Sequence, residues 1–227
     1  MNNFSFIIPV LNESLFFTKQ QLYLQALLDK GHEIIVVDGG SDDDSFVEAE
    51  KLGCKCLRTK ASRGFQLQSG AKASSNDVLV FLHADTILPL TSLDNIYEAL
   101  NKPNASWGRF DVEFTNKKLI FKIIAWFMNK RSCITGIATG DQAIFIKRKT
   151  YFDSGGFAEI PLMEDIEFSK RLKRHSRPIC LNNAVITSSR KWEKNGIFKT
   201  ILLMWRIRLL YFFGIPAEQL AKRYYFK

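Results

Sequence analysis

The first hundred residues alternate short apolar runs with longer segments in which apolar residues recur every three or four positions. Short apolar runs between turn-forming residues predict buried strands, whereas the longer period predicts helices. We expect strands at 4–10, 33–37, 54–58 and 77–83, and helices at 15–29, 43–52, 64–74 and 93–100. This alternation is typical of an α/β fold with a mostly parallel central sheet and helices on both of its faces.

The pattern changes after residue 100. Residues 106–114 alternate as an antiparallel or edge strand does, and 142–148 also resemble a strand. Further helices are expected at 119–129, at 164–175 and on each side of Ile215-Pro216. The sequence contains no internal repeat, low-complexity segment or domain linker. We therefore predict one continuous domain over 1–190, with halves at 1–100 and 101–190, followed by basic amphipathic helices over 191–227.

Most of the net charge lies in the tail. Of the formal charge of +9, residues 190–227 carry +7, from nine basic and two acidic side chains. Such an excess attracts phospholipid, nucleic acid or another polyanion. The apolar segment 196–214 is interrupted by Lys199, Arg206 and Arg208. A central arginine costs about 2.5–3.5 kcal/mol in a spanning helix, so we expect no transmembrane helix here.

The four cysteines predict neither a disulfide framework nor a metal site. No C-x-x-C occurs, and Cys54 and Cys56 alternate along a predicted strand. We expect these two, together with Cys133 and Cys180, to be buried reduced thiols. The chain opens directly on a strand and has no basic segment of a secretory signal, so a cytoplasmic location is expected.

Polar side chains follow two of the predicted strands at their carboxyl ends, where α/β sheets bind ligands. Asp38 follows the second strand and precedes two glycines, and it can accept hydrogen bonds from a ligand. His83 and Asp85 end the fourth strand, and their spacing aims both to the same side of an extended chain. An imidazole and a carboxylate together suit a divalent cation. The acidic cluster 42–44 is interpreted mainly as helix capping.

Two helix starts add further candidates. Arg63 would place a cation near a ligand's phosphates, although a surface position is the alternative. Glu164 and Asp165 begin a helix, where a carboxylate favours the helix dipole and can also deprotonate a hydroxyl. Neighbouring residues diverge on a helix, so we expect only one of the pair to face a cleft.

The segments FIIPVLNES, VVDGGSDD, FLHAD, TGDQAIFIKR, GGF and MEDIE occur in this order, and the chain resembles a family 2 glycosyltransferase of the GT-A fold over essentially its whole length. WGRFDV, TGIATGDQA and the apolar, basic tail are similar to the subfamily associated with radical-SAM and selenoprotein-type domains. The resemblance implies that 1–100 bind the nucleotide and that 101–190 bind the acceptor. It also implies a nucleotide-diphosphate sugar donor, commonly UDP-linked, a manganese or magnesium ion, and inversion at the sugar.

Roles for individual residues follow from this resemblance. The donor would contact Pro9, Leu11, Glu13, Asp38, Arg63, His83 and Asp85. Asp85, helped by His83, would bind the metal, and Gly140 and Asp141 would contact the acceptor. Asp165, with its neighbour Glu164, would supply the general base.

The chain departs from the family pattern at two places. His83 replaces the first aspartate of D-x-D, which leaves the metal and the donor open. Arg190, Lys191 and Trp192 lack the spacing of the family's Q/R-x-x-R-W motif, so processive synthesis is not expected. A non-catalytic nucleotide-sugar-binding protein and a nucleotidyltransferase remain alternatives. The latter is disfavoured because PVLNES is not a phosphate-binding loop.

The partners of the tail also remain open. One interpretation places helix 196–214 in an anionic membrane surface, at the inner face of the membrane, beside a lipid-linked acceptor. The alternative is that this helix packs on the sheet or in a homodimer interface. Nucleic acid is not expected as a partner, because the tail is too apolar for a solvated groove.

Overall fold

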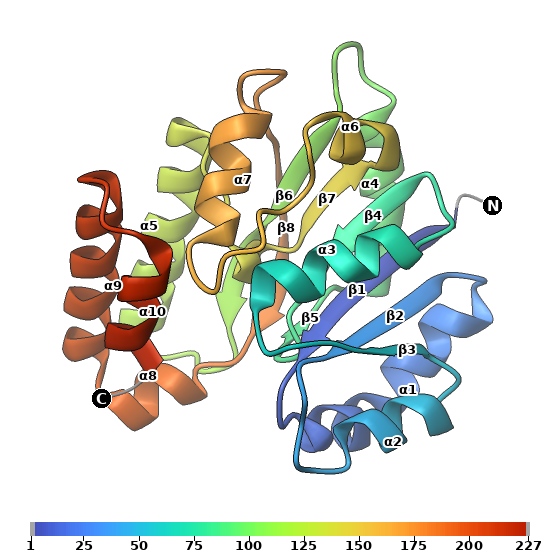
Figure 1. Ribbon diagram of the computed structural model, residues 1–227. Helices are drawn as coiled ribbons and strands as arrows, with labels where there is room; N and C mark the ends of the chain where they lie inside the picture. Colours follow the sequence, from blue (N-terminus) through green and yellow to red (C-terminus); the bar gives the residue numbers. More distant parts are fainter. Residues whose placement is uncertain (1–2, 226–227) are drawn as a thin grey trace.

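The computed structural model describes residues 3–225 and forms an eight-stranded sheet with helices around it (Figure 1). The strand order is β3-β2-β1-β4-β7-β6-β8-β5. The strands are β1 (Phe4–Val10), β2 (Glu33–Asp38), β3 (Lys55–Arg58), β4 (Val78–Phe81), β5 (Thr86–Ile87), β6 (Trp107–Phe114), β7 (Ile144–Lys147) and β8 (Ile179–Thr187). Two ends of the predicted domains, residues 1–2 and 226–227, lie outside the described residues.

The helices follow the strands in the alternation that the sequence predicts. They are α1 (Ser14–Asp29), α2 (Ser45–Lys51), α3 (Arg63–Ala73), α4 (Leu93–Leu100), α5 (Leu119–Thr135), α6 (Arg148–Asp153), α7 (Glu164–Leu172), α8 (Arg190–Asn195), α9 (Ile197–Phe212) and α10 (Ala217–Tyr225). Short 3-10 turns occur at η1 (Leu90–Ser92) and η2 (Gly140–Gln142).

The sheet is mixed. Strands β1 to β4 are parallel to one another, whereas β7 runs antiparallel to both β4 and β6. Strand β6 therefore confirms the antiparallel pairing expected of 106–114, but it lies inside the sheet, because β8 pairs with it in parallel. The α/β class predicted from the sequence is confirmed.

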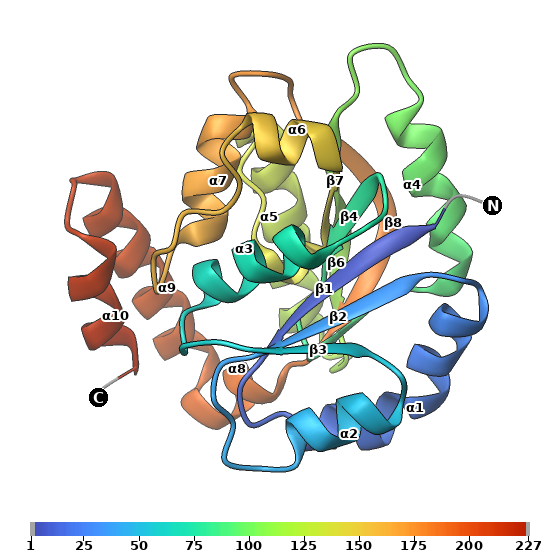
Figure 2. The same ribbon diagram turned by 45° about the vertical axis from the view of Figure 1, so that its right-hand side comes forward.

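Two apolar cores occupy opposite faces of this sheet. Along β1, Phe6 and Ile8 belong to one core and Ile7 to the other, as the two-residue period of a strand requires. Helices α1, α2, α4 and α5 pack in the first core, and α3, α6 and α7 pack in the second. Figure 2 shows these helices from a second side. Because helices pack on both faces of the sheet, the carboxyl ends of β1 and β4 are held in place at the same edge of the sheet.

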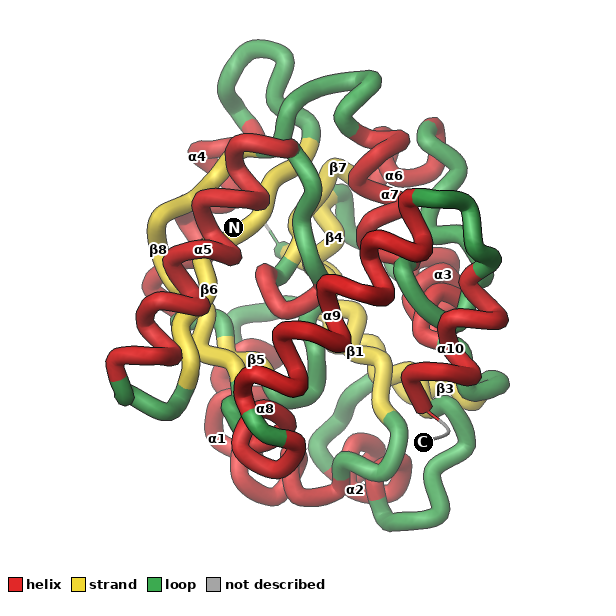
Figure 3. Tube along the Cα trace, turned by 90° about the vertical axis from the view of Figure 1, so that its left-hand side faces the viewer, coloured by secondary structure: helices red, strands yellow, loops and turns green. Residues whose placement is uncertain are grey.

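The C-terminal helices do not stand apart from the domain. Ile207 of α9 and Leu220 of α10 form a third core with Met163 and Ile166 at the start of α7. Helix α9 lies at the left-hand edge of the molecule in Figure 1 and runs across the face turned to the viewer in Figure 3. None of the helices within residues 3–225 combines the length and the apolar character needed to cross a membrane.

The expectation of four reduced thiols is wrong for two of them. Cys133 at the end of α5 and Cys180 at the start of β8 form a disulfide, with Cα atoms 5.9 Å apart. The two residues are 47 positions apart, so only the packing of α5 beside β8 brings them together. Cys54 and Cys56 are free, as predicted. Disulfides are rare in the cytosol, so the Cys133–Cys180 bond does not support the expected cytoplasmic location. That location stays a prediction.

Candidate active site

A cleft of about 650 Å³ lies where the carboxyl end of β1, the segment after β4 and the start of α7 meet. All but one of the predicted site residues line it: Pro9, Leu11, Glu13, Arg63, His83, Asp85, Gly140, Asp141, Glu164 and Asp165. Helices α8, α9 and α10 supply the opposite wall. Residues from distant parts of the sequence thus converge in one cleft, which is large enough for a small-molecule ligand.

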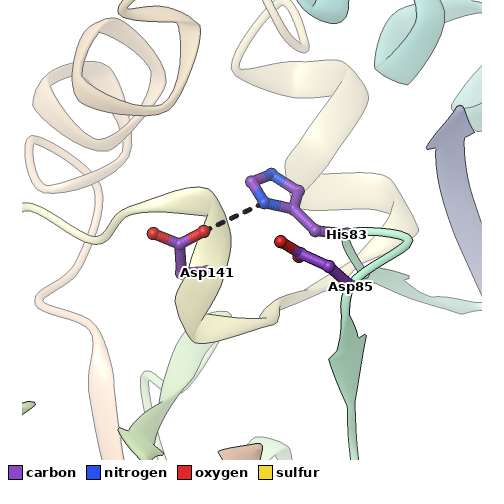
Figure 4. A group of neighbouring side chains, drawn as sticks. All are labelled: His83, Asp85 and Asp141. Carbon is purple, nitrogen blue, oxygen red and sulfur yellow. Dashed lines mark hydrogen bonds and ion pairs between the residues drawn. The ribbon is translucent and has the colours of Figure 1, made fainter. Parts of the chain in front are cut away.

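One end of the cleft holds His83, Asp85 and Asp141, which we call the triad end. Each offers a ligand atom, and these atoms all lie within 4.8 Å of one another. Figure 4 shows the imidazole of His83 hydrogen-bonded to Asp141 and the carboxylate of Asp85 beside them. The distance from Nδ1 of His83 to Oδ1 of Asp141 is 3.2 Å. An imidazole and two carboxylates form a donor set that fits a divalent cation.

The turn that carries Asp141 is fixed from behind. Thr139 and Gln142 form a capping box around η2, and Nε2 of Gln142 donates to Oγ of Ser132 on α5 at 2.9 Å. Gly140 packs so closely against the ring of His83 that a Cβ atom there would collide with Nε2. A glycine is therefore required for His83 and Asp141 to approach each other.

Charges at the triad end favour an ionised Asp141. Burial raises its pKa, but the hydrogen bond with His83 and nearby positive charges, including Arg63 and Lys191, outweigh burial and hold the pKa below its ordinary value. Burial and the charge of Arg63 also lower the pKa of Lys191, which disfavours the charged form of the lysine. The triad end is thus a half-open group of acids with cations close by.

The other end of the cleft, which we call the helix end, holds Glu164 and Asp165. Asp165 accepts hydrogen bonds from the N–H groups of Gly140 at 3.0 Å and Ile166 at 2.7 Å. Two carboxylate oxygens have about four lone-pair directions, so Asp165 keeps capacity for another donor. Its position is set by backbone groups on two separate elements.

Glu164 is almost completely buried, with 2% of its surface exposed. Nη1 of Arg63 lies 3.6 Å from its Oε1. Burial raises the pKa of Glu164 to about 7, with the charge of Arg63 opposing this shift and that of Asp165 adding to it. Both members of the pair line the cleft, contrary to the expectation of one, but only Asp165 is substantially accessible.

The backbone near the helix end is specialised. Met163, directly before α7, has a φ of 66°, in the left-handed region that residues with a side chain seldom adopt. Gly64 at the start of α3 lies against the carbonyl oxygen of Ala158, where a Cβ atom would not fit. These two positions bring the starts of α3 and α7, and hence Arg63 and Glu164, into contact.

Asp38 is the predicted site residue that does not line the cleft. Its surface is 1% exposed, and its carboxylate accepts the N–H of Ser41 at 3.1 Å and also the hydroxyl of Ser41. The capping expected of the acidic cluster 42–44 holds for Asp43, whose Oδ2 accepts the N–H of Ser14 at the start of α1, but Asp44, directly before α2, makes no capping hydrogen bond with its side chain. Hydrogen bonds from Ser45 and Ser14 outweigh the effect of burial and lower the pKa of Asp43 to about 2.

The sequence analysis missed the cations that the tail brings to the cleft. Lys191 of α8 and Arg208 of α9 line it. Nζ of Lys191 lies 4.1 Å from the ring centroid of Tyr224 on α10. Cations within an otherwise apolar helix could have indicated such residues in the sequence. Which of these cations face the cleft is shown only by the packing of α9 and α10 on α7.

A family model described as glycosyl transferase family 2 matches residues 5–158 of this chain. The chain belongs to glycosyl transferase family 2. The matched segment includes β1 to β7 and most of the cleft, and it stops before Glu164 and Asp165.

Solved structures of glycosyltransferases share the fold. Residues 1–349 of S. aureus TarS in complex with UDP match with a TM-score of 0.67 and 17% identity, covering 82% of this chain and 60% of that chain. The M. tuberculosis glucosyl-3-phosphoglycerate synthase in complex with Mn²⁺, UDP and glucosyl-3-phosphoglycerate matches with a TM-score of 0.59 and 17% identity, covering 81% and 70%. The chain thus spans about 60% of the TarS fragment. At this identity the likeness shows the GT-A fold.

Proposed function

We propose that this protein transfers a sugar from a UDP-linked donor to an acceptor hydroxyl with inversion at the anomeric carbon. One observation carries the proposal: the triad end and Asp165 share a single cleft although Asp85 and Asp165 lie 80 positions apart in the chain (165 − 85). Family membership supports transferase chemistry, and UDP is the ligand of structures with the same fold.

The triad end would hold a divalent cation. His83, Asp85 and Asp141 supply one nitrogen and two carboxylate ligands, so Asp141 moves from the acceptor role suggested by the resemblance to a metal ligand. When bound, the cation would neutralise the diphosphate leaving group. Imidazole nitrogen suits manganese better than magnesium, so Mn²⁺ is the favoured ion of the two.

The remaining residues position and deprotonate the substrates. Pro9, Leu11 and Glu13 line the donor side of the cleft, and Arg63 and Lys191 lie where the phosphates would be. At the helix end Asp165 takes the proton of the acceptor hydroxyl while the hydroxyl oxygen forms a bond to the anomeric carbon. The bond from that carbon to the diphosphate breaks, and the diphosphate leaves with the electron pair. General-base help of this kind is worth about 10²–10⁴-fold in rate.

Calorimetric titration of UDP, with and without Mn²⁺, tests this proposal. In the wild type we expect Mn²⁺ to raise the affinity for UDP, whereas Asp85→Ala should lose at least about tenfold of the metal-dependent affinity. Glu159→Gln, an exposed carboxylate outside the cleft, is the matched control. Unchanged Mn²⁺-dependent affinity in Asp85→Ala would contradict the metal assignment. Sugar release from a panel of nucleotide sugars then separates an enzyme from a binding protein or a nucleotidyltransferase.

We also propose that α5 and α9 lie against an anionic membrane surface, where a lipid-linked acceptor would be available. On α9, Phe198 is 80% exposed and Trp205 is 71% exposed, and on α5 Phe127 is 61% exposed. Neither helix contains an aspartate or glutamate, whereas exposed cations occur on both, at Lys122, Lys130, Lys199 and Arg206. Exposed aromatic side chains among cations complement the interface of an anionic bilayer.

Flotation with vesicles that contain phosphatidylglycerol tests the membrane proposal. The wild type should float with anionic vesicles and stay at the bottom with neutral ones. The double variant Phe198→Glu/Trp205→Glu should stay at the bottom, whereas Leu22→Glu, which changes an exposed leucine on α1, should still float. A wild type that does not float, and that sediments as a dimer which the double variant breaks, would instead assign this face to a homodimer interface.

A further inference from the structure

Two arginines, on α5 and α9, lie close enough to Asp165 or its cleft to matter for a ligand, although Arg131 is not among the residues that line the cleft. Arg208 of α9 lines the cleft together with Asp165. Arg131 of α5 is close enough to both of them for their charges to act on its guanidinium. Nη2 of Arg131 and Nε of Arg208 are buried and have no hydrogen-bond partner. Neither arginine forms an ion pair within 4.0 Å among the residues that the structure describes.

This arrangement is unfavourable without a further partner. Burial and the charge of Arg208 lower the pKa of Arg131 to about 10, although the charge of Asp165 opposes this effect. A guanidinium still keeps its proton at neutral pH, so both arginines stay charged and Arg131 also feels the positive charge of Arg109. Each buried donor without a partner has lost its hydrogen bonds to water without replacing them, which disfavours the folded state. An anion between the two guanidinium groups would satisfy the donors and relieve the repulsion.

Lys191 and Arg131 differ in the acids that act on their charges. Asp85 and Asp141 act on the charge of Lys191, so that lysine belongs to the triad end. Asp165 acts on the charge of Arg131, and neither Asp85 nor Asp141 is among the groups that shift the pKa of Arg131. Lys191 is thus associated with the triad and Arg131 with Asp165, whereas Arg63 acts on Asp141 and also lies 3.6 Å from Glu164.

We propose that Arg131 and Arg208 bind a negatively charged oxyanion of the acceptor, a phosphate or a carboxylate, and so direct the acceptor hydroxyl to Asp165. The inference rests on the proposed function and names the substrate class for the same cleft. Guanidinium groups suit such oxyanions because their planar forks donate two parallel hydrogen bonds. Acceptors without an anionic group would bind weakly and react slowly.

Sulfate, an oxyanion shaped like a phosphate group, is the probe for this subsite. Thermal unfolding is followed while sulfate is titrated against protein already saturated with UDP and Mn²⁺, so that the donor site is filled. The wild type should gain stability with sulfate, and Arg131→Gln/Arg208→Gln should lose at least about tenfold in apparent sulfate affinity. Arg206→Gln, an exposed arginine on the same helix, controls for general salt effects.

The outcomes separate this inference from the proposed function. Stabilisation of the double variant by UDP and Mn²⁺, equal to that of the wild type, shows that the variant folds and that the donor site is intact. Retained sulfate binding in the double variant would overturn the inference. So would a sulfate effect in the wild type that disappears once UDP is bound, because the oxyanion would then occupy the donor site. Absence of UDP binding in the wild type would instead overturn the proposed function.

Discussion

The two ends of the cleft treat their carboxylates differently. At the triad end Asp141 keeps 39% of its side-chain surface exposed, and its carboxylate is hydrogen-bonded to the imidazole of His83. At the helix end Glu164 is buried against Arg63, and Asp165 is held by two backbone N–H groups. A group that receives a cation from solution must stay open, whereas a group that moves a proton must be held in place. The difference in anchoring thus matches the two roles that we propose.

The same contrast appears in the cations around each end. Lys191 lies near the acids of the triad end, and Arg63 acts on Asp141 as well as on Glu164. Arg208 shares the cleft with Asp165, the charge of Asp165 acts on Arg131, and each arginine has a buried donor without a partner. We therefore propose an anion as the partner of Arg131 and Arg208, whereas Lys191 already has acids nearby.

Asp165→Asn, which removes the proposed general base at the helix end, should have the largest effect on the rate of sugar transfer. The amide keeps one oxygen for the N–H of Gly140 but cannot accept a proton. Sugar transfer should fall by about 10²–10⁴-fold, while the affinity for UDP with Mn²⁺ should stay within about twofold of the wild type. Initial-rate kinetics and UDP titration measure the two quantities on the same preparation. A variant that transfers sugar at the wild-type rate would remove Asp165 from the mechanism.

Much of the nucleotide-binding half could be predicted from sequence. Strands β1, β2 and β4 are apolar runs with a parallel register, and they end at the residues expected to carry chemistry. Strand β8 was missed because exposed Asn182 and Asn183 interrupt it. Its pairing with β6 shifts register at this point, between Phe110 and Asp111. Helices α6 and α8 were missed because each has only six, mostly polar, residues.

The candidate site divides in the same way. Motif residues such as His83, Asp85 and Asp165 follow strands or begin helices, so local pattern located them. The inward cations Lys191 and Arg208 depend on how α8 and α9 pack, and Cys133 meets Cys180 through the contact of α5 with β8. Long-range packing of this kind leaves no local pattern in the sequence. The division of the fold into a nucleotide-binding half at 1–100, an acceptor-binding half at 101–190 and a tail at 191–227 remains a proposal.

Glu164→Gln sharpens the comparison through stability. The raised pKa of Glu164 means that the folded state holds a proton between its ordinary value of 4.5 and about 7. Protonated Glu164 fits the buried site, so its contribution to folding is present at low pH and is lost as pH rises through this window. The neutral amide avoids that loss. The variant should therefore match the wild type near pH 4.5 and exceed it above pH 7, by up to about 3 kcal/mol.

Chemical denaturation across this pH range measures the difference, with Glu159→Gln as the control on an exposed carboxylate. The control should follow the wild type at each pH. A constant difference between Glu164→Gln and the wild type would mean that the carboxylate titrates alike in the folded and unfolded states. Arg63, 3.6 Å from Glu164, would then fully offset the burial of the carboxylate. A stabilisation by Glu164→Gln that grows with pH would instead show that the buried acid lowers the stability of the wild type. Such a loss of stability is expected where a residue is kept for its role in the active site.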